Sequence, residues 1–349
     1  MPFLPILIFF ITLGLLIFVH EYGHFWAAKR AGVRVLEFGF GFPPKLLSWR
    51  RGETKYSLNA LPFGGFVKLF GEDHQETGPG SFRSASVAKR LRIVLAGVFM
   101  NLLLAIAILT IGFTIGMTPM ATDPAKLGGT SQEQVVILSV LPGSPADRAG
   151  LKSGDVLQGF DSAEAIQQFT RSHRGETVTI GVGETNPRQV EVVLGGDADA
   201  PLGVHVTSVS IVKLPLHKAF VAAVRETGNV IHSLARFVVG FFTNLTVRQE
   251  LSEQAVGPVG IYVITEKAID FGASYVLQLL ALLSINLAVI NILPFPALDG
   301  GRAIFLAAEG IFGRQVMKPK FEGLVHTIGF AILVVLLLVL TYRDIVRFF

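Results

Sequence analysis

Four long apolar runs alternate with polar stretches along this sequence, at residues 3–27, about 93–117, about 274–298 and about 324–341. Each run is long enough for a helix to cross the hydrocarbon core of a bilayer, which takes about 20 residues. Charged residues make up only 16% of the chain, against about a quarter in soluble domains. The pattern therefore predicts a polytopic α-helical membrane protein with four transmembrane helices.

The charges of the loops predict how these helices are oriented. Residues 28–92 carry twelve Lys or Arg and five Asp or Glu, whereas residues 118–215 carry seven and eleven. Basic loops stay on the cytoplasmic side, so we expect 28–92 inside, 118–215 outside and both termini outside. The modest net charge of +4 gives no indication of nucleic-acid binding.

The loop between the first two helices is rich in Gly, Phe and Pro. Within residues 31–72, Lys55–Leu61 alternates polar and apolar side chains and Phe63–Leu69 follows. This pattern predicts two or three short strands interrupted by Pro62 and the glycines. Because so apolar a sheet adjoins the membrane, we expect a membrane-associated β element that dips into the interface or lines a cavity within the protein.

Residues 135–206 have the pattern of a small α+β domain. Strands are expected at 135–141, 156–160, 176–183 and 189–194, a short helix at 143–149 and a longer one over about 162–172. The next segment, 216–247, predicts a long helix that holds Arg225, Glu226, His232 and Arg236. Its charges favour an amphipathic helix at the outer surface; the alternative, a fifth span, would change the topology.

The first apolar run contains the strongest indication of chemistry, His20-Glu21-Tyr22-Gly23-His24. Residues four apart on a helix lie on one face, so both imidazoles can reach one metal ion, and Glu21 is placed to take a proton from water. His and Glu side chains within a spanning segment are costly and usually functional. The pattern predicts a metal site for hydrolysis, with zinc, iron or manganese as the candidate metals, rather than two polar residues at a helix end.

A catalytic zinc takes three protein ligands, and with no cysteine in the chain the third must be His, Asp or Glu. Asp299 is expected at the inner end of the third span, which matches the depth of His20 and His24. Pro294 and Pro296 prevent a regular helix before it. His326, at the start of the fourth span, is the alternative ligand, and a simple turn is the alternative role for Asp-Gly-Gly.

Three motifs together resemble one known family. His20–His24, Pro62–Lys68 and the segment Asn291–Gly301, with its Leu-Asp-Gly-Gly end, are similar in order and spacing to the site-2 proteases. The resemblance is to the bacterial branch, in which a PDZ domain lies between spans two and three. Gly143–Ala146 and Ala149–Asp155 are similar to the PDZ signature.

The resemblance implies specific roles for residues of this chain. His20, His24 and Asp299 would hold Zn2+, and Glu21 would be the general base. Substrate-binding roles are implied for Asn286, Asn291, Gly64, Gly65, Phe66 and Val67. The asparagines can equally serve as hydrogen-bonding residues between helices, and the PDZ-like domain can bind peptide termini or only exclude bulky ectodomains.

The function implied is that of an intramembrane zinc metalloendopeptidase of a bacterial cytoplasmic membrane, embedded in the lipid bilayer. Its substrates would be single-span membrane proteins, cut in regulated proteolysis such as anti-sigma factor release, or leftover signal peptides. Two alternatives remain at this stage. One is a non-proteolytic membrane scaffold that bears a PDZ domain, and the other is a metal-dependent transporter, for which spans two and four offer few polar residues.

The expected organisation follows from these patterns and from the resemblance. In chain order it is a first helix in 1–30, a cytoplasmic β element in 31–92, a second helix in 93–117, an extracytoplasmic PDZ-like α+β domain in 118–215, an amphipathic helix in 216–250, a third helix with Leu-Asp-Gly-Gly in 274–310 and a fourth helix in 324–341.

Overall fold

The computed structural model describes residues 3–72, 78–183, 187–196, 200–243, 255–314, 317 and 319–349. These residues form two compact units. The first consists of Met1–Ala107, Val230–Ile264 and Leu280–Phe349, and the second of Ile108–Asn229 and Thr265–Leu279.

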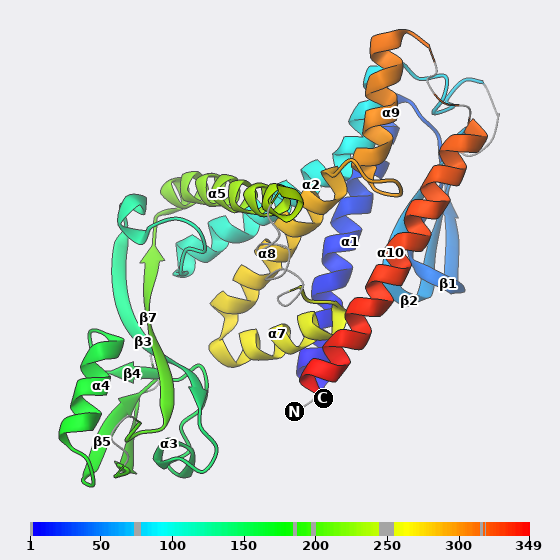
Figure 1. Cartoon of the computed structure of the whole chain (residues 1–349). Helices are drawn as coiled ribbons and strands as arrows, with labels where there is room; N and C mark the ends of the chain where they lie inside the picture. The colour runs from blue at the N-terminus through cyan, green and yellow to red at the C-terminus, as the bar shows by residue number, and fades with distance from the viewer. Residues whose placement is uncertain are drawn as a thin grey trace. The chain divides into compact units, whose positions relative to one another are not determined.

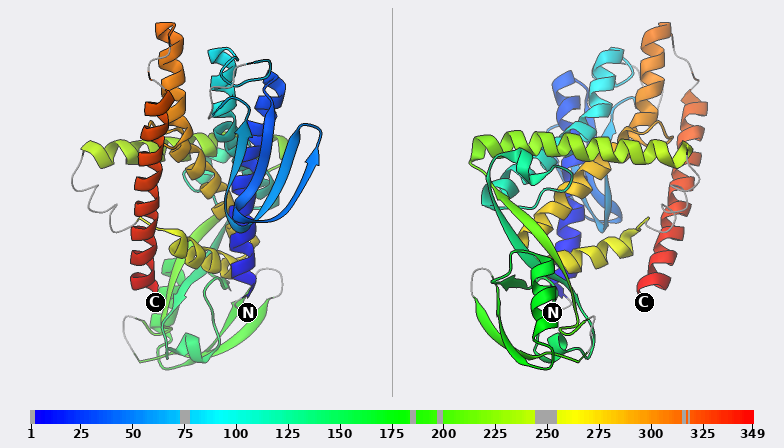
Figure 2. Two further views of the ribbon diagram at one scale, coloured as in Figure 1. Left: turned by 90° about the vertical axis from the view of Figure 1, so that its right-hand side faces the viewer. Right: turned by 60° about the vertical axis from the view of Figure 1, so that its left-hand side comes forward.

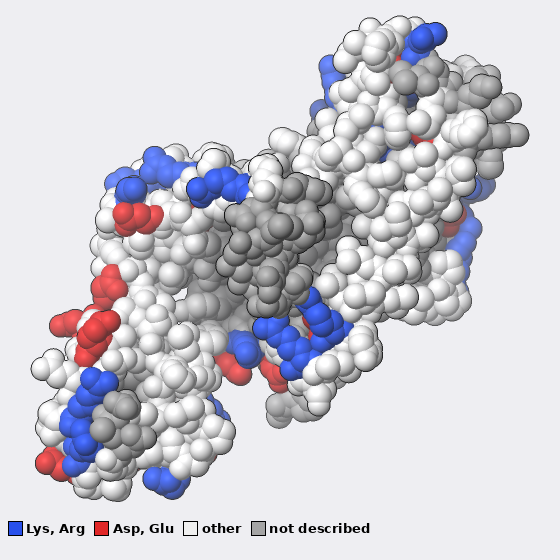
Figure 3. All heavy atoms as spheres, viewed as in Figure 1, with Lys and Arg blue, Asp and Glu red and all other residues white. Residues whose placement is uncertain are grey.

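Among the described residues, four helices are long and apolar enough to cross a membrane, as predicted: α1 (Phe3–Ala31), α2 (Val87–Ile115), α8 (Ala273–Ile292) and α10 (Pro319–Phe348). They confirm a polytopic membrane protein. Most apolar side chains of α10 are exposed, and the surface along it carries few charges (Figure 3). The start of α1 and the end of α10 lie at the same end of the first unit (Figures 1 and 2), as an even number of spans requires.

The third span is shorter than predicted. Helix α8 ends at Ile292 and the short helix α9 (Asp299–Phe312) begins only after an irregular segment. The predicted span through 298 was therefore too long at its inner end, whereas the break that was predicted before Asp299 is present. Pro294 and Pro296 are the physical reason, because proline lacks the amide hydrogen that a continued helix needs.

The β element is a hairpin of two long strands, β1 (Val35–Arg51) and β2 (Thr54–Leu69), where two or three short strands were predicted. Both strands bend, and Glu37 pairs with Lys68 on one side and Lys55 on the other. The last part of β2 therefore pairs only with the beginning of β1 and forms an edge of the sheet. The hairpin lies along α1 (Figure 2).

A buried cluster joins the ends of α1 and β2 to the beginnings of β1 and α2, and to α9. Its members are Ala28, Val33, Val35, Leu69, Phe82, Ile93, Val94 and Leu306. Beside it Arg90, buried at the beginning of α2, donates two hydrogen bonds to the Glu309 carboxylate of α9, at 3.0 and 2.6 Å. This core fixes α9 against α2 and so sets where Asp299, at the start of α9, can lie.

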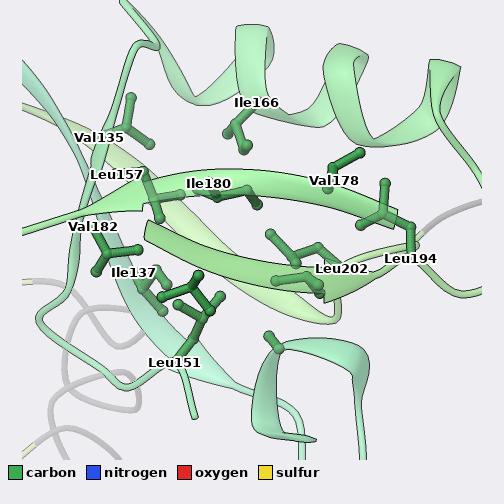
Figure 4. Close-up of a cluster of buried hydrophobic side chains, with 13 residues drawn as sticks. Val135, Ile137, Leu151, Leu157, Ile166, Val178, Ile180, Val182, Leu194 and Leu202 are labelled. Atoms are coloured by element: carbon green, nitrogen blue, oxygen red, sulfur yellow. The ribbon is translucent and has the colours of Figure 1, made fainter. Parts of the chain in front are cut away.

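The second unit contains a five-stranded antiparallel sheet in the order β6-β5-β4-β3-β7. Its core is apolar and combines side chains of the strands with others from the connecting segments, such as Leu151 and Ile166 (Figure 4). The elements are η1 (Pro124–Leu127), β3 (Thr130–Val140), α3 (Pro145–Arg148), β4 (Val156–Gln158), α4 (Ala163–Ser172), β5 (Thr177–Val182), β6 (Arg188–Val193) and β7 (Val204–Lys213). All but η1 and β7 overlap predicted elements, and β3 begins five residues before the strand predicted at 135–141.

Helix α5 (Leu216–Thr243) begins where the long helix was predicted, and 244–250 of that prediction lie outside the described residues. It is not among the four candidate spans. Glu226, one of its charged residues, is fully buried and accepts hydrogen bonds from the amides of Met120 and Ala121 at 2.5 and 2.6 Å. These two hydrogen bonds hold the loop after α2 against α5. Helix α7 (Pro258–Phe271) was not predicted.

The Arg90–Glu309 pair gives a test of this packing. Because both oxygens of Glu309 pair with a buried guanidinium, Glu309→Leu alone leaves an uncompensated charge. We expect Arg90→Met/Glu309→Leu to be more stable than either Arg90→Met or Glu309→Leu. A double-mutant cycle on thermal unfolding in detergent should give a coupling free energy of about 1–3 kcal/mol. Additive single effects would contradict the ion pair between Arg90 and Glu309.

Candidate metal centre

Three side chains from distant parts of the chain converge in the first unit. The Nε2 atoms of His20 and His24, one turn apart on α1, lie 3.2 Å from each other. The Oδ2 atom of Asp299 lies 3.2 Å from the first nitrogen and 3.4 Å from the second. No other group of three such residues that can hold a metal occurs among the described residues. The predicted depth match between α1 and Asp299 is therefore realised as contact.

These separations are those of ligands around one small cation. Two atoms bound tetrahedrally to zinc at about 2.1 Å are about 3.4 Å apart. Two imidazole nitrogens and one carboxylate oxygen at 3.2–3.4 Å from one another therefore fit zinc, which prefers this donor set. Three ligands leave a fourth position for water or substrate.

Hydrogen bonds on the far side of the rings orient them. His24 Nδ1 lies 2.8 Å from the carbonyl oxygen of Ile93. Because a carbonyl can only accept, Nδ1 carries the hydrogen in the neutral ring and Nε2 presents its lone pair to the centre. This arrangement is the usual outer support of a metal-binding histidine.

Asn101 of α2 supports His20. Its amide nitrogen lies 3.3 Å from His20 Nδ1, and its amide oxygen is buried without a partner among the described residues. Turning the amide brings the oxygen to Nδ1, where it accepts the ring hydrogen and leaves the Nε2 lone pair for a metal. The Ser284 hydroxyl of α8 donates a hydrogen bond of 2.8 Å to the backbone carbonyl of Asn101. Helices α1, α2 and α8 are thus linked behind the three converging side chains.

Gly97, one turn before Asn101, makes room for the two rings. A Cβ atom at this position would lie 2.4 Å from His24 Nε2 and 2.7 Å from His20 Cε1. Sequence analysis missed both residues of α2. The available indication was Asn101 itself, a polar side chain in the middle of an otherwise apolar span, where polar groups usually have partners.

A cavity of about 390 Å3 opens beside the three side chains. Glu21 lines it, and Gly65 of β2 lies against the Glu21 side chain, since a Cβ there would come within 2.8 Å of Glu21 Cγ. Of the residues predicted to bind substrate, Gly64, Gly65, Phe66, Val67 and Asn291 line this cavity. Asn286, half-buried on α8, is not among its described lining residues.

Asp299 is the first residue of α9, and close packing of the backbone next to it sets its position. A Cβ at Gly300 would lie 2.1 Å from the Ile292 carbonyl oxygen, and one at Gly301 would lie 2.3 Å from that of Phe295. Only glycine allows the chain to double back this tightly. Arg302, which also lines the cavity, forms an ion pair with Glu72, a further pair that sequence analysis missed.

The alternative ligand His326 is not at the metal centre. Its Nδ1 accepts a hydrogen bond of 2.9 Å from the amide of Ala297, two residues before Asp299. His173 forms a hydrogen bond with the Phe169 carbonyl at the end of α4. His205 lies in β7, and His217 and His232 lie in α5. His74 lies outside the described residues.

Comparison with known proteins identifies the class of enzyme. The model of peptidase family M50 matches residues 8–336. A putative zinc metalloprotease of Clostridium perfringens is 33% identical over 344 residues, 95% of each chain. The zinc metalloprotease RasP of Geobacillus kaustophilus is 29% identical, covering 99% of this chain and 98% of the relative. The regulator of sigma-W protease RasP of Bacillus subtilis is 27% identical over 99% of both.

These relatives do not favour the scaffold alternative, and they imply zinc as the cofactor. With its four apolar spans, the protein is an intramembrane zinc metalloprotease, and the chain belongs to peptidase family M50, the site-2 protease family.

Proposed function

We propose that His20, His24 and Asp299 hold the zinc ion and that Glu21 is the general base for peptide hydrolysis. The observation that supports this most is the set of three ligand-atom separations, 3.2, 3.2 and 3.4 Å. When bound, zinc activates water and polarises the scissile carbonyl. Glu21, on the same helix and on the wall of the cavity, takes the proton from water and passes it to the leaving amine.

The substrate that fits this cavity is an extended peptide. The segment Gly65–Leu69 is an edge of the hairpin sheet, and its first residues line the cavity next to Glu21. An edge strand offers unpaired amide and carbonyl groups to which a second chain can add. We propose that a substrate helix unwinds and pairs here, and that the Asn291 amide, which faces the same cavity, holds the reacting carbonyl. Asn286, on the same helix as Asn291, remains a candidate substrate-binding residue.

The substrates proposed are single-span membrane proteins. One relative is named a regulator of sigma-W protease, which makes an anti-sigma factor a suitable candidate, with leftover signal peptides as a second. By the positive-inside rule, residues 28–92 and the zinc side of the spans face the cytoplasm. We place the protein in the cytoplasmic membrane of a bacterium with the second unit's sheet domain outside.

We also propose that this sheet domain is PDZ-like. Strand β7 is an edge strand, α4 lies beside it, and a small pocket between them is lined by Ile166, Thr170, Leu202, Gly203 and Val204, among others. A groove between a helix and an edge strand is where PDZ domains add a peptide. The pocket is small, at about 30 Å3, and exclusion of bulky ectodomains is the alternative role.

Replacement of the base separates chemistry from metal binding. Glu21→Gln keeps the shape of the side chain but cannot accept the proton, so we expect cleavage of a membrane-helix reporter to fall by about 10²–10⁴-fold. Zinc content, measured on the same purified protein, should stay at the wild-type level. Cleavage at the normal rate would contradict the role of Glu21.

Removal of the third ligand should act on the metal itself. We expect Asp299→Ala to lower zinc affinity, measured by chelator competition, by more than the roughly 10–100-fold that loss of an outer partner costs. Asp344→Asn is the control, since Asp344 is a carboxylate of the first unit that is even more buried than Asp299 but accepts from the Gly260 amide. Full zinc affinity of Asp299→Ala would show that the ligand set is wrong.

A further inference from the structure

The segment that leads into Asp299 contains a strained turn. The Leu298 amide donates to the Phe295 carbonyl at 3.1 Å, which closes a β-turn with Pro296 and Ala297 at its centre. Ala297 has φ of +76° and is the one non-glycine residue with positive φ in the described part of the chain. Positive φ at the third position alone defines a type II turn, and glycine or asparagine is the usual residue there.

The sequence by itself does not favour this conformation. Proline at the second position suits both type I and type II turns, and alanine at the third suits type I. The two types differ by a flip of the central peptide, here the one that joins Pro296 to Ala297. For a residue with a Cβ, positive φ costs roughly 1–2 kcal/mol, so contacts outside the turn must select the type II form.

Helix α10 supplies contacts to both ends of that peptide. The Ala297 amide donates to Nδ1 of His326 at 2.9 Å. One turn later on the same face of α10, Gly329 lies against the other end, since a Cβ there would be 2.5 Å from the Pro296 carbonyl oxygen. The ring of Phe305, on α9, meets the His326 ring edge-to-face with centroids 6.0 Å apart. The imidazole is thus held from both sides.

A flipped peptide would lose both contacts. Its amide would point away from His326, and its carbonyl would leave the space that Gly329 provides. The flip also changes the direction in which the chain enters Leu298 and Asp299. The carboxylate oxygen lies within 3.4 Å of both histidine nitrogens, and a shift of about 1 Å is enough to disturb such a site.

We propose that His326 is a positioning residue of the metal centre: by accepting the Ala297 amide it locks the Pro296–Ala297 peptide in the type II orientation that presents Asp299 to His20 and His24. The inference rests on the proposed role of Asp299 as a ligand. It gives α10, whose outer face is otherwise exposed, a direct part in building the site, through the pair His326 and Gly329.

The test is a double-variant experiment on zinc affinity, measured by competition with a chelator in purified full-length protein. We expect His326→Ala to weaken zinc binding by about 10–100-fold, as other outer-support losses do. Ala297→Gly should leave affinity within about 3-fold of wild type, because glycine adopts positive φ without cost. In His326→Ala/Ala297→Gly, glycine should restore most of the lost zinc affinity, because a glycine at 297 adopts the type II turn without the hydrogen bond to His326.

Two further variants keep the result interpretable. His326→Asn should stay within about 3-fold of wild type, since its side-chain oxygen is an acceptor close to the position of Nδ1. Ile328→Ala, an exposed residue of the same helix, should leave both zinc affinity and the thermal unfolding midpoint unchanged. If His326 only supported the fold, Ala297→Gly would not restore the zinc affinity lost in His326→Ala, and His326→Asn would not keep it.

The outcomes separate the two proposals. Wild-type zinc affinity in His326→Ala, together with weakened binding in Asp299→Ala, overturns the positioning role and leaves the ligand set intact. Weakened binding in His326→Ala that neither asparagine nor Ala297→Gly restores also overturns it, and indicates either a purely structural role of His326 or direct binding of the metal. Full affinity in Asp299→Ala contradicts the ligand set on which the inference rests.

Discussion

The close approach of α1 and α2 is the contact on which the proposed metal centre depends. At Gly23 a Cβ would lie 2.4 Å from the Ala96 carbonyl oxygen, and at Gly97 one would lie 2.4 Å from His24 Nε2. Close approach at small residues is the usual way in which membrane helices associate, because lipid offers no hydrophobic drive between them. Here it also brings the Ile93 carbonyl and the Asn101 amide to the outer nitrogens of the two histidines.

The second requirement is irregular backbone at membrane depth. An unpaired amide or carbonyl costs several kcal/mol in hydrocarbon, so such backbone persists only where the protein satisfies it. Between α8 and α9 the chain does so with its own turns and with α10, where His326 takes the Ala297 amide. The broken helix therefore serves to place Asp299 opposite the histidines of α1.

Much of this could be predicted from the sequence, for identifiable reasons. The four spans follow from hydropathy, and His20 and His24 follow from their spacing on one helix. Asp299 could be matched to them by depth, because both helices must end at the same side of the bilayer. The break before Asp299 follows from Pro294 and Pro296, although the end of α8 at Ile292 came earlier than the apolar run suggested.

What could not be predicted depends on tertiary contact. Asn101 and Gly97 of α2 contact His20 and His24, which lie on another helix. The Arg302–Glu72 ion pair joins segments that are about 230 residues apart in the sequence. His326 was considered as a ligand because its type and depth were suitable; only the geometry shows that it contacts the Ala297 amide instead. The bent hairpin and strand β7 were missed because pairing, not local pattern, defines them.

The central claim is that two imidazoles and one carboxylate converge on one zinc ion, and X-ray absorption at the zinc edge of the purified protein tests it most directly. The account predicts scattering from two histidine rings, with nitrogen and oxygen atoms at about 2.0–2.2 Å, and loss of the two-ring signature in His20→Ala/His24→Ala. A three-ring signature in the wild-type protein would contradict the assignment of Asp299 and indicate His326 or another histidine as the third ligand.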